Sequence, residues 1–142
     1  MHQTNENAVR QACTDLIVRY AYLNDERRFV ELAELFTADA VLYRPSAPEQ
    51  GVVGRDAILA AFCKRPADTM TFHATSDILV DVQDGQQAQA RSRILLLSAI
   101  RAPDASALPI EPKLPVPGVF HDSFVRTDDG WKFAERRGLF WI

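Results

Sequence analysis

Apolar side chains recur every three or four positions in the first part of the chain, the spacing that gathers them on one face of a helix. Over residues 5–24 they form a single stripe made of Val9, Cys13, Leu16, Ile17, Tyr20 and Leu23. Shorter stretches of the same kind cover residues 27–36 and 56–64, and Asp56 is placed to cap the last of these. The pattern predicts three helices in this part of the chain.

The second half of the chain is rich in strand-forming residues. Turn signals at 84–85 and 128–130, each containing Asp-Gly, separate long strand-like segments. The expected strands are two short runs at 40–43 and 50–53 and four long segments at 70–82, 87–100, 116–127 and 131–141. Because the helices come first and long antiparallel strands twist and curl, the pattern predicts an α+β fold. A helical layer would pack on a strongly curved antiparallel sheet, whose cone-shaped interior forms a small-molecule pocket.

The segment 101–117 interrupts this pattern because it contains five prolines in 17 residues. Proline lacks a backbone N–H, so such a run cannot form the interior of a sheet. The segment is therefore predicted to be a long loop within a single domain that spans residues 1–142. Long loops in compact domains are often lids or partner contacts, and a surface excursion without a role is also compatible with the pattern.

Charge and composition exclude several classes of protein. The formal net charge is −3 and 25% of the residues are charged, with both signs mixed along the chain. This distribution lacks the basic patch that binds nucleic acid and the polybasic run that binds a membrane surface. The chain begins without the features of a signal peptide and has no window near ~18 consecutive apolar residues, so we expect a cytoplasmic protein. Cys13 and Cys63 lack metal-ligand spacing and are interpreted as buried apolar thiols, so no metal site is expected.

Three polar residues fall where the pattern predicts an interior: Tyr20, Asp25 and His73. Each has a structural interpretation, as a core tyrosine, an N-cap of the second helix and a hydrogen-bonded structural histidine, respectively. Each also has a functional interpretation, as a hydroxyl aimed into the cavity, a carboxylate beside the pocket and a general base. The phase of His73 along its strand is ambiguous, and a β-bulge would resolve it.

A histidine paired with a carboxylate suits proton abstraction. Imidazole takes and returns a proton near neutral pH, and the carboxylate fixes the ring tautomer and stabilises the imidazolium. A nearby phenol can hold a developing enolate oxygen. Tyr20, Asp25 and His73 together would therefore remove a proton beside a carbonyl, followed by loss of water, isomerisation or ring closure.

Two pairs of neighbours on the later strands add further candidates. His121 and Asp122 point to opposite faces of one strand, and we favour His121 as the residue that enters the pocket. In a regular strand either Arg136 or Arg137 must point inward, where it would need a carboxylate partner or an anionic ligand. A bulge or a sheet edge would instead leave both arginines in solvent.

These residues belong to segments that resemble SnoaL-like proteins of the nuclear-transport-factor-2-like (NTF2-like) superfamily. The similar segments are 19–25, 35–41, 54–58, the strand that contains His73, and 130–136. The resemblance covers nearly the whole chain except 101–117. It implies a cystatin-like α+β barrel, in which a cone-shaped curved mixed sheet is wrapped by about three N-terminal helices.

The functional analogy is with the branch that resembles bile acid 7α-dehydratase and, more distantly, scytalone dehydratase. In that branch a Tyr, an Asp five residues later, a strand His and a late Arg line the pocket, and the matching positions here are Tyr20, Asp25, His73 and Arg136. The resemblance implies His73 as the base, Asp25 as its orienting partner and Tyr20 as an oxygen ligand, with no metal or organic cofactor. The bile acid enzyme also uses an acidic residue in the next strand, but segment 88–98 contains no Asp or Glu.

We therefore expect a cofactor-independent lyase (dehydratase) or isomerase that acts on a hydrophobic cyclic, steroid- or polyketide-like small molecule. Arg136 and His121 would contact the substrate. The alternative is a non-catalytic small-molecule-binding or assembly module of the same fold. Because the outer face of a concave sheet is often covered by another subunit, we also expect a homodimer or homotrimer.

Overall fold

The structure, a computed structural model, describes residues 3–101 and 111–141. Its helices are α1 (Gln3–Asp25), α2 (Phe29–Ala33) and α3 (Arg55–Cys63). Its strands are β1 (Phe36–Tyr43), β2 (Gly51–Val53), β3 (Thr69–Val82), β4 (Gln87–Ile100), β5 (Glu111–Pro112), β6 (Val116–Thr127) and β7 (Gly130–Phe140). None of the helices in this described part is long and apolar enough to cross a membrane.

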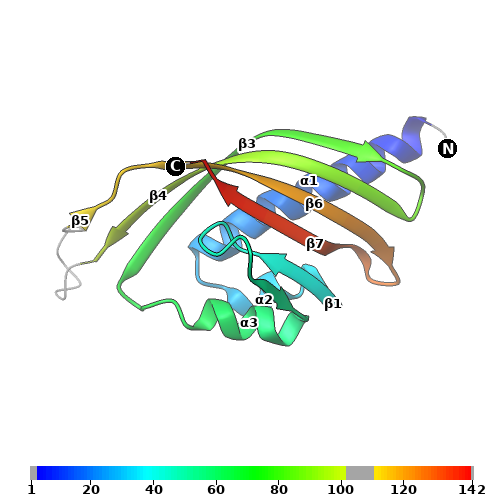
Figure 1. The fold of residues 1–142 in the computed structure, drawn as a ribbon. Helices are drawn as coiled ribbons and strands as arrows, with labels where there is room; N and C mark the ends of the chain where they lie inside the picture. Colours follow the sequence, from blue (N-terminus) through cyan, green and yellow to red (C-terminus); the bar gives the residue numbers. More distant parts are fainter. Residues whose placement is uncertain (1–2, 102–110, 142) are drawn as a thin grey trace.

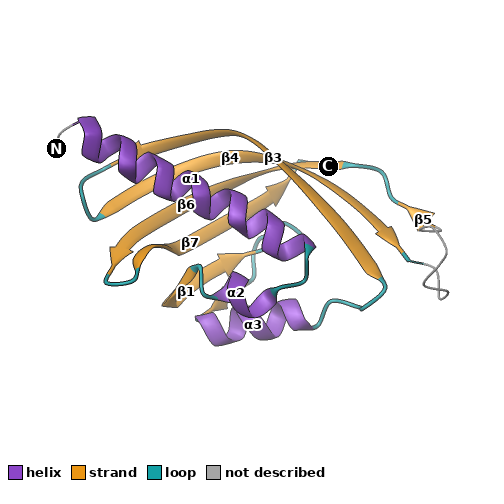
Figure 2. Cartoon of the chain, turned by 180° about the vertical axis from the view of Figure 1, so that it is seen from behind, coloured by secondary structure: helices purple, strands orange, loops and turns teal. Residues whose placement is uncertain are grey.

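The strands form one mixed sheet in the order β2-β1-β7-β6-β4-β3, with β5 paired to β4. All neighbours are antiparallel except β1 and β7, which run parallel. The long strands curve around α1, whereas α2 and α3 lie together near β1 (Figures 1 and 2). This arrangement confirms the expected α+β architecture, with a helical layer on one face of a curved sheet.

The core lies between α1 and the inner face of the sheet. Along β4, the buried side chains are Ala88, Ala90, Ser92 and Ile94, and the positions between them are exposed. Tyr20 of α1 stands at the centre of this core, where four phenylalanine rings surround it with centroids 6.0–6.1 Å away in edge-on geometry. Such aromatic pairs contribute ~0.5–1.5 kcal/mol each beyond the burial of area, so Tyr20 anchors α1 to the sheet.

A β-bulge in β3 resolves the ambiguous phase of His73. The register with β4 shifts between Ser76 and Leu79, and Asp77 at this point has a φ of 54°. Before the bulge the odd-numbered residues are at least half-buried, and after it the even-numbered residues are. His73 precedes the bulge and therefore lies on the inner face, whereas Leu79 is exposed.

Several local expectations need correction. The second helix is shorter than predicted, because the chain from Phe36 onward pairs with β7 as strand β1. Asp56 does not cap α3: the N-cap is Gly54, whose φ of 94° favours glycine, and no side chain caps the helix. Cys63 is exposed, although Cys13 is buried as expected.

The proline-rich segment departs from the predicted loop at Glu111–Pro112, which form β5 and pair with β4, whereas β6 has the bounds predicted for that strand, 116–127. Pro117 belongs to β6, opposite Leu95, and its carbonyl accepts a hydrogen bond from the Trp141 amide at 3.0 Å. It is the second residue of the strand, close to the strand start where proline is tolerated. The middle of the predicted loop, 102–110, lies outside the described residues.

Candidate active site

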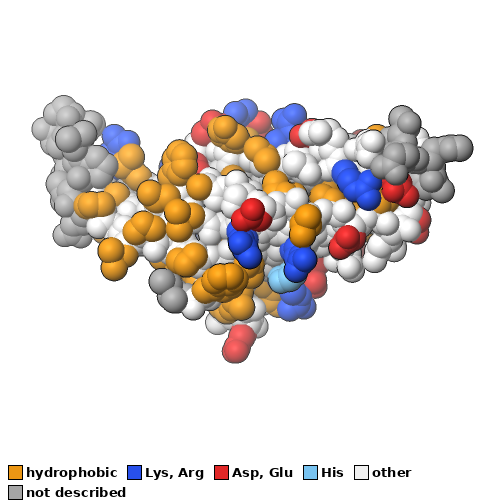
Figure 3. Space-filling view, turned by 90° about the horizontal axis from the view of Figure 1, so that it is seen from above, with side chains coloured by type: hydrophobic (Ala, Val, Ile, Leu, Met, Phe, Trp, Pro, Cys, Tyr) orange, Lys and Arg blue, Asp and Glu red, His pale blue; other side chains and the backbone are white. Residues whose placement is uncertain are grey.

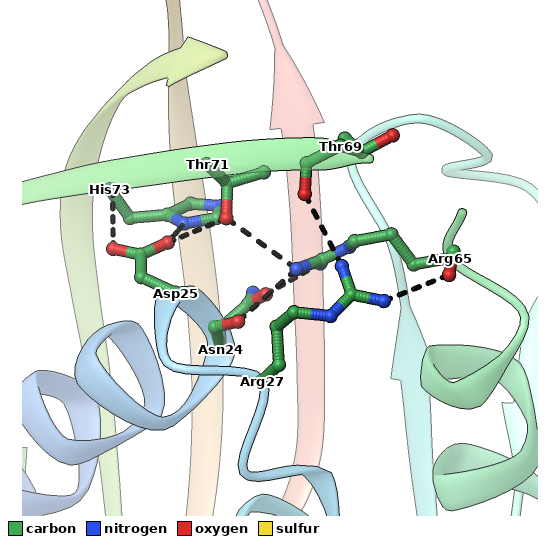
Figure 4. A network of polar contacts seen from close by, with 7 residues as sticks. All are labelled: Asn24, Asp25, Arg27, Arg65, Thr69, Thr71 and His73. Atoms are coloured by element: carbon green, nitrogen blue, oxygen red, sulfur yellow. Dashed lines mark hydrogen bonds and ion pairs between the residues drawn. The ribbon is translucent and has the colours of Figure 1, made fainter. Parts of the chain in front are cut away.

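The turn after α1 brings Asp25 to the start of β3. Arg27 adopts a φ of 60° in this turn, which is uncommon for a residue other than glycine. Its guanidinium donates hydrogen bonds to the carbonyl oxygens of Arg65, Pro66 and Thr69 at 3.0, 3.2 and 3.3 Å. These bonds tie the turn to the connection between α3 and β3 and so fix the position of Asp25 (Figure 4).

The Asp25 carboxylate binds His73 at two points. Its Oδ1 lies 2.5 Å from His73 Nδ1, and its Oδ2 accepts the His73 backbone N–H at 2.8 Å. The Thr71 hydroxyl donates a third hydrogen bond to Oδ1 at 2.9 Å. The side chains of His73 and Asp25 are only 11% and 19% exposed, so solvent competes little with these contacts. The structure thus brings Asp25 and His73 together as a dyad whose carboxylate is held by its neighbours (Figure 4).

This geometry assigns the two nitrogens of the His73 ring different roles. When the ring is neutral, Nδ1 carries the proton because it faces a carboxylate, and Nε2 is left with a free lone pair. No hydrogen bond joins Nε2 to any of the residues that the structure describes. Nε2 is therefore the atom that can accept a proton from a bound molecule.

A half-open cavity of about 230 Å³ lies beside His73. Its lining includes the aromatic residues Tyr20, Phe62, Phe120 and Phe140, the aliphatic residues Ile94 and Leu96, and the polar residues Asn24, Arg44, Arg65, Thr71, Ser98 and His73. His73 also lines a groove of about 390 Å³ on the outer side of α1 and β3, together with Asp25 and the exposed Tyr22 and Phe72. His73 therefore faces both the half-open cavity and the groove, whereas Asp25 lines only the groove.

Tyr20 lies on the cavity wall as well as in the core. Burial of its ring raises the pKa of the Tyr20 hydroxyl to about 12, although Arg136 opposes this effect. The phenol is therefore protonated at neutral pH and can donate a hydrogen bond to a ligand oxygen. This is the chemical form that the predicted oxygen-binding role requires.

A buried ion pair, Asp122 with Arg136, lies beneath the cavity. The Asp122 Oδ1 is 3.4 Å from the Arg136 Nε, and the two side chains are 0% and 2% exposed. The Arg136 guanidinium stacks on the rings of Phe120 and Tyr20, with its central carbon 3.8 and 4.2 Å from their centroids. Arg136 is thus the inward arginine, and Asp122 is the carboxylate partner expected for it. The rings of Tyr20 and Phe120, which line the cavity, lie between Arg136 and the cavity space. Its predicted contact with a substrate would need those rings to move.

The expectation that His121 enters the pocket is wrong. His121 is exposed on the outer face, where it lines a groove with Arg91, Arg93 and Trp141. Asp122 takes the interior position because it alternates with the buried rings of Phe120 and Phe124. That alternation was visible in the sequence and gave the correct phase.

Sequence reasoning missed Asn24, Arg44, Arg65 and Thr71. Thr71 could have been found, because it is two residues before His73 and shares its strand face. Asn24, Arg44 and Arg65 stand at a helix end or in connections, where no periodic pattern predicts which way a side chain points. As for metal ligands, the described residues contain no group of three or more His, Cys, Asp or Glu side chains that could hold an ion.

Comparison with known proteins identifies the family and the fold. The family described as SnoaL-like domain matches residues 5–137. The hexachlorocyclohexane dehydrochlorinase LinA, type 2, is 17% identical, with a TM-score of 0.81 over 99% of this chain and 90% of that chain. A candidate scytalone dehydratase from Novosphingobium aromaticivorans is 24% identical, with a TM-score of 0.79 over 99% and 89%.

An NTF2-like protein with a cystatin-like fold, from the same bacterium, is 22% identical with a TM-score of 0.74 over 99% of this chain and 90% of that chain. No curated protein matches the chain by sequence. At these identities the similar structures establish the NTF2-like fold.

Proposed function

Because the chain belongs to the SnoaL-like domain family, we propose that it is a lyase that uses His73 to start an elimination reaction in the half-open cavity. His73 Nε2 takes a proton from carbon, the electrons of the C–H bond form a double bond, and a leaving group departs from the neighbouring carbon with its bonding pair. The observation that carries this proposal is the Asp25–His73 dyad, whose histidine lines the cavity.

Each neighbouring group supports one part of this step. Asp25 orients the ring and stabilises the imidazolium that forms when the proton is taken. Thr71 holds the carboxylate in place through its hydroxyl. Tyr20 donates a hydrogen bond to a carbonyl oxygen that gains negative charge, which lowers the barrier to carbon deprotonation. When the leaving group is hydroxide, the imidazolium can return the proton and release water.

The names of two similar structures are consistent with elimination chemistry. One is a dehydrochlorinase and the other is named as a candidate dehydratase. Both names describe removal of a small molecule from a carbon framework. They favour an elimination over the isomerisation that the same residues could also perform.

The size of the cavity favours a compact substrate. Pockets for drug-sized ligands usually measure ~300–1,000 Å³, whereas this cavity measures about 230 Å³. A ligand with one or two rings therefore fits better than a steroid. We propose a small cyclic or unsaturated carbonyl compound as the substrate class.

A Kemp elimination tests the proposal without knowledge of the natural substrate. A base removes one proton from carbon in 5-nitrobenzisoxazole, the N–O bond breaks, and the coloured cyanophenolate is released. General base catalysis contributes ~10²–10⁴-fold, so His73→Gln should lower the rate by at least ~100-fold. The matched control His121→Gln removes the histidine of the outer face and should leave the rate unchanged. An undiminished rate in His73→Gln would contradict the proposed base.

We also propose that further copies of this chain cover the outer face of the sheet. Hydrophobic side chains gather on this face (Figure 3), where Phe72, Leu97, Leu139 and Trp141 are 63%, 41%, 50% and 61% exposed. Phe72 and Leu97 are direct partners across β3 and β4. Light scattering at micromolar concentration should show a dimer or trimer that Leu97→Glu dissociates, and a monomeric wild type would overturn this assignment.

A further inference from the structure

We propose that Arg44 and Arg65 form an anion-binding subsite on the cavity wall, so that the ligand of the cavity is a small organic carboxylate. This deepens the proposed function, on which it rests for the reaction, although anion binding itself needs no turnover. Both arginines line the cavity, and both line an adjoining hollow of about 260 Å³ that also contains Lys64. The two spaces share Arg44, Ser46, Phe62 and Arg65.

Arg65 is held in place entirely by neutral groups. It donates hydrogen bonds to the Asn24 carbonyl oxygen at 3.1 Å, to Asn24 Oδ1 at 2.5 Å and to the Thr71 hydroxyl at 3.5 Å. Its guanidinium also lies over the rings of Phe29 and Phe62, 5.3 and 5.8 Å from their centroids. Desolvation by burial, followed by the charge of Arg27, lowers the pKa of Arg65, although Tyr20 and Asp25 oppose this effect. The positive charge is thus positioned on the cavity wall with no carboxylate bonded to it directly, and Asp25 reaches it only through Thr71 (Figure 4).

Arg44 has even fewer partners. Its Nε is buried and has no hydrogen-bond partner among the described residues. No ion pair joins its guanidinium to any residue in the described part of the chain. A half-buried arginine usually has a carboxylate or other acceptor to satisfy its donors. Arg44 lines the cavity and the adjoining hollow, so its guanidinium is placed to meet a ligand there.

No acidic side chain among the described residues balances these charges on the cavity wall. The linings of the cavity and of the adjoining hollow contain no Asp or Glu. The carboxylate nearest to Arg65 in the network is Asp25, which is bound to His73 and Thr71. Asp122 lies under the wall beside Arg136. The missing counterion is therefore one that the ligand supplies.

A carboxylate matches this site better than a neutral oxygen. Guanidinium groups bind carboxylates through paired N–H···O contacts, and hydrogen bonds between ionised partners are about twice as strong as neutral ones. The aromatic and aliphatic part of the lining would hold the rest of the molecule. An anionic carbonyl compound would thus be fixed at the arginines while another of its carbons meets His73.

The test compares two probes of the same shape, trans-cinnamate and its neutral amide, trans-cinnamamide. Calorimetric titration of the wild-type protein should show cinnamate binding at least ~10-fold more tightly, since a hydrogen bond to a charged group is the stronger contact. Arg44→Gln should reduce this preference to about threefold or less. Arg44→Gln has no hydrogen bond among described residues to lose and should fold normally. Arg91→Gln, on the outer face, is the matched control and should keep the preference.

Three results would overturn the subsite. They are equal affinity for the two probes, no saturable binding of cinnamate up to its solubility limit, and an unchanged preference in Arg44→Gln. Inorganic phosphate that binds as tightly as cinnamate, with the same dependence on Arg44, would overturn the assignment of an organic ligand. The same titration in His73→Gln separates this inference from the proposed function. Carboxylate preference without His73-dependent Kemp elimination would refute the lyase proposal alone, and the reverse result would refute the subsite alone.

Discussion

The buried Asp122 should make the protein less stable as the pH rises from about 4 to about 6. The side chain is 0% exposed, and neither carboxylate oxygen has a hydrogen-bond partner among the described residues. Burial raises its pKa from the ordinary value of 3.8 to about 6, although Arg136 opposes this effect. Arg136 approaches at 3.4 Å, a distance that allows an ion pair but not a good hydrogen bond. The pair therefore compensates only part of the cost of burying the charge.

The sign and size of the effect follow from proton linkage. Below pH ~4 the Asp122 carboxyl is protonated in both the folded and the unfolded chain, so it does not change the free energy of unfolding with pH in that range. Between pH ~4 and ~6 the folded chain binds more protons than the unfolded chain, and the free energy of unfolding falls as the pH rises. Each pKa unit is equivalent to ~1.4 kcal/mol, so the total loss is about 3 kcal/mol by pH ~7.

Urea unfolding of the wild type and of Asp122→Asn across this pH range measures the effect. The asparagine leaves Arg136 without a negative neighbour, which lowers stability by an amount that does not change with pH. The difference between the two curves therefore isolates the titration of Asp122. It should change by about 3 kcal/mol between pH ~4 and ~7, with the wild type losing its relative stability toward higher pH. A difference that is flat, or that changes in the opposite direction, would refute the reasoning.

Two further predictions concern other parts of the molecule. Burial, followed by the charge of Asp122, raises the pKa of the Cys13 thiol to about 12, whereas Cys63 is exposed. A thiol reagent should therefore modify only Cys63 in the folded protein at neutral pH and both cysteines in urea. Rapid modification of both cysteines in the folded protein would contradict the burial of Cys13. At Gly138 an added Cβ would lie 2.4 Å from Pro45 Cγ and 2.8 Å from the Phe120 ring. Gly138→Ala should therefore lower stability by ~1–3 kcal/mol, whereas unchanged thermal unfolding would show that this contact has room to relax.

Local patterns predicted most of the fold, because helix and strand periodicity depends on neighbouring residues. The exception at Phe36 shows the limit of that approach. The apolar spacing of 27–36 fits a helix, but pairing with β7 across the sheet draws Phe36 into a strand. Strand alternation required that either Arg136 or Arg137 point inward, and the family resemblance selected Arg136. The alternation of Asp122 with Phe120 and Phe124 would have placed Asp122 inside in preference to His121.

The site was less accessible from the sequence because distant segments build it. Asp25 and His73 are 48 residues apart, and nothing in their spacing brings them together; the family resemblance suggested the pair. The two arginines of the cavity lie in connections whose paths depend on tertiary contacts. Arg65, for example, is positioned by the contacts of its backbone with Arg27 and of its side chain with Asn24.

The central claim is that Asp25 holds His73 with Nε2 free to take a proton from a molecule in the cavity. Long-range ¹H–¹⁵N correlation spectra of the ring, recorded above the ordinary titration range of imidazole, test this directly. The structure predicts a protonated Nδ1 and an unprotonated Nε2, and Asp25→Asn should abolish this preference. An Nε2-protonated ring in the wild type, or an Nδ1-protonated ring that persists unchanged in Asp25→Asn, would contradict the account.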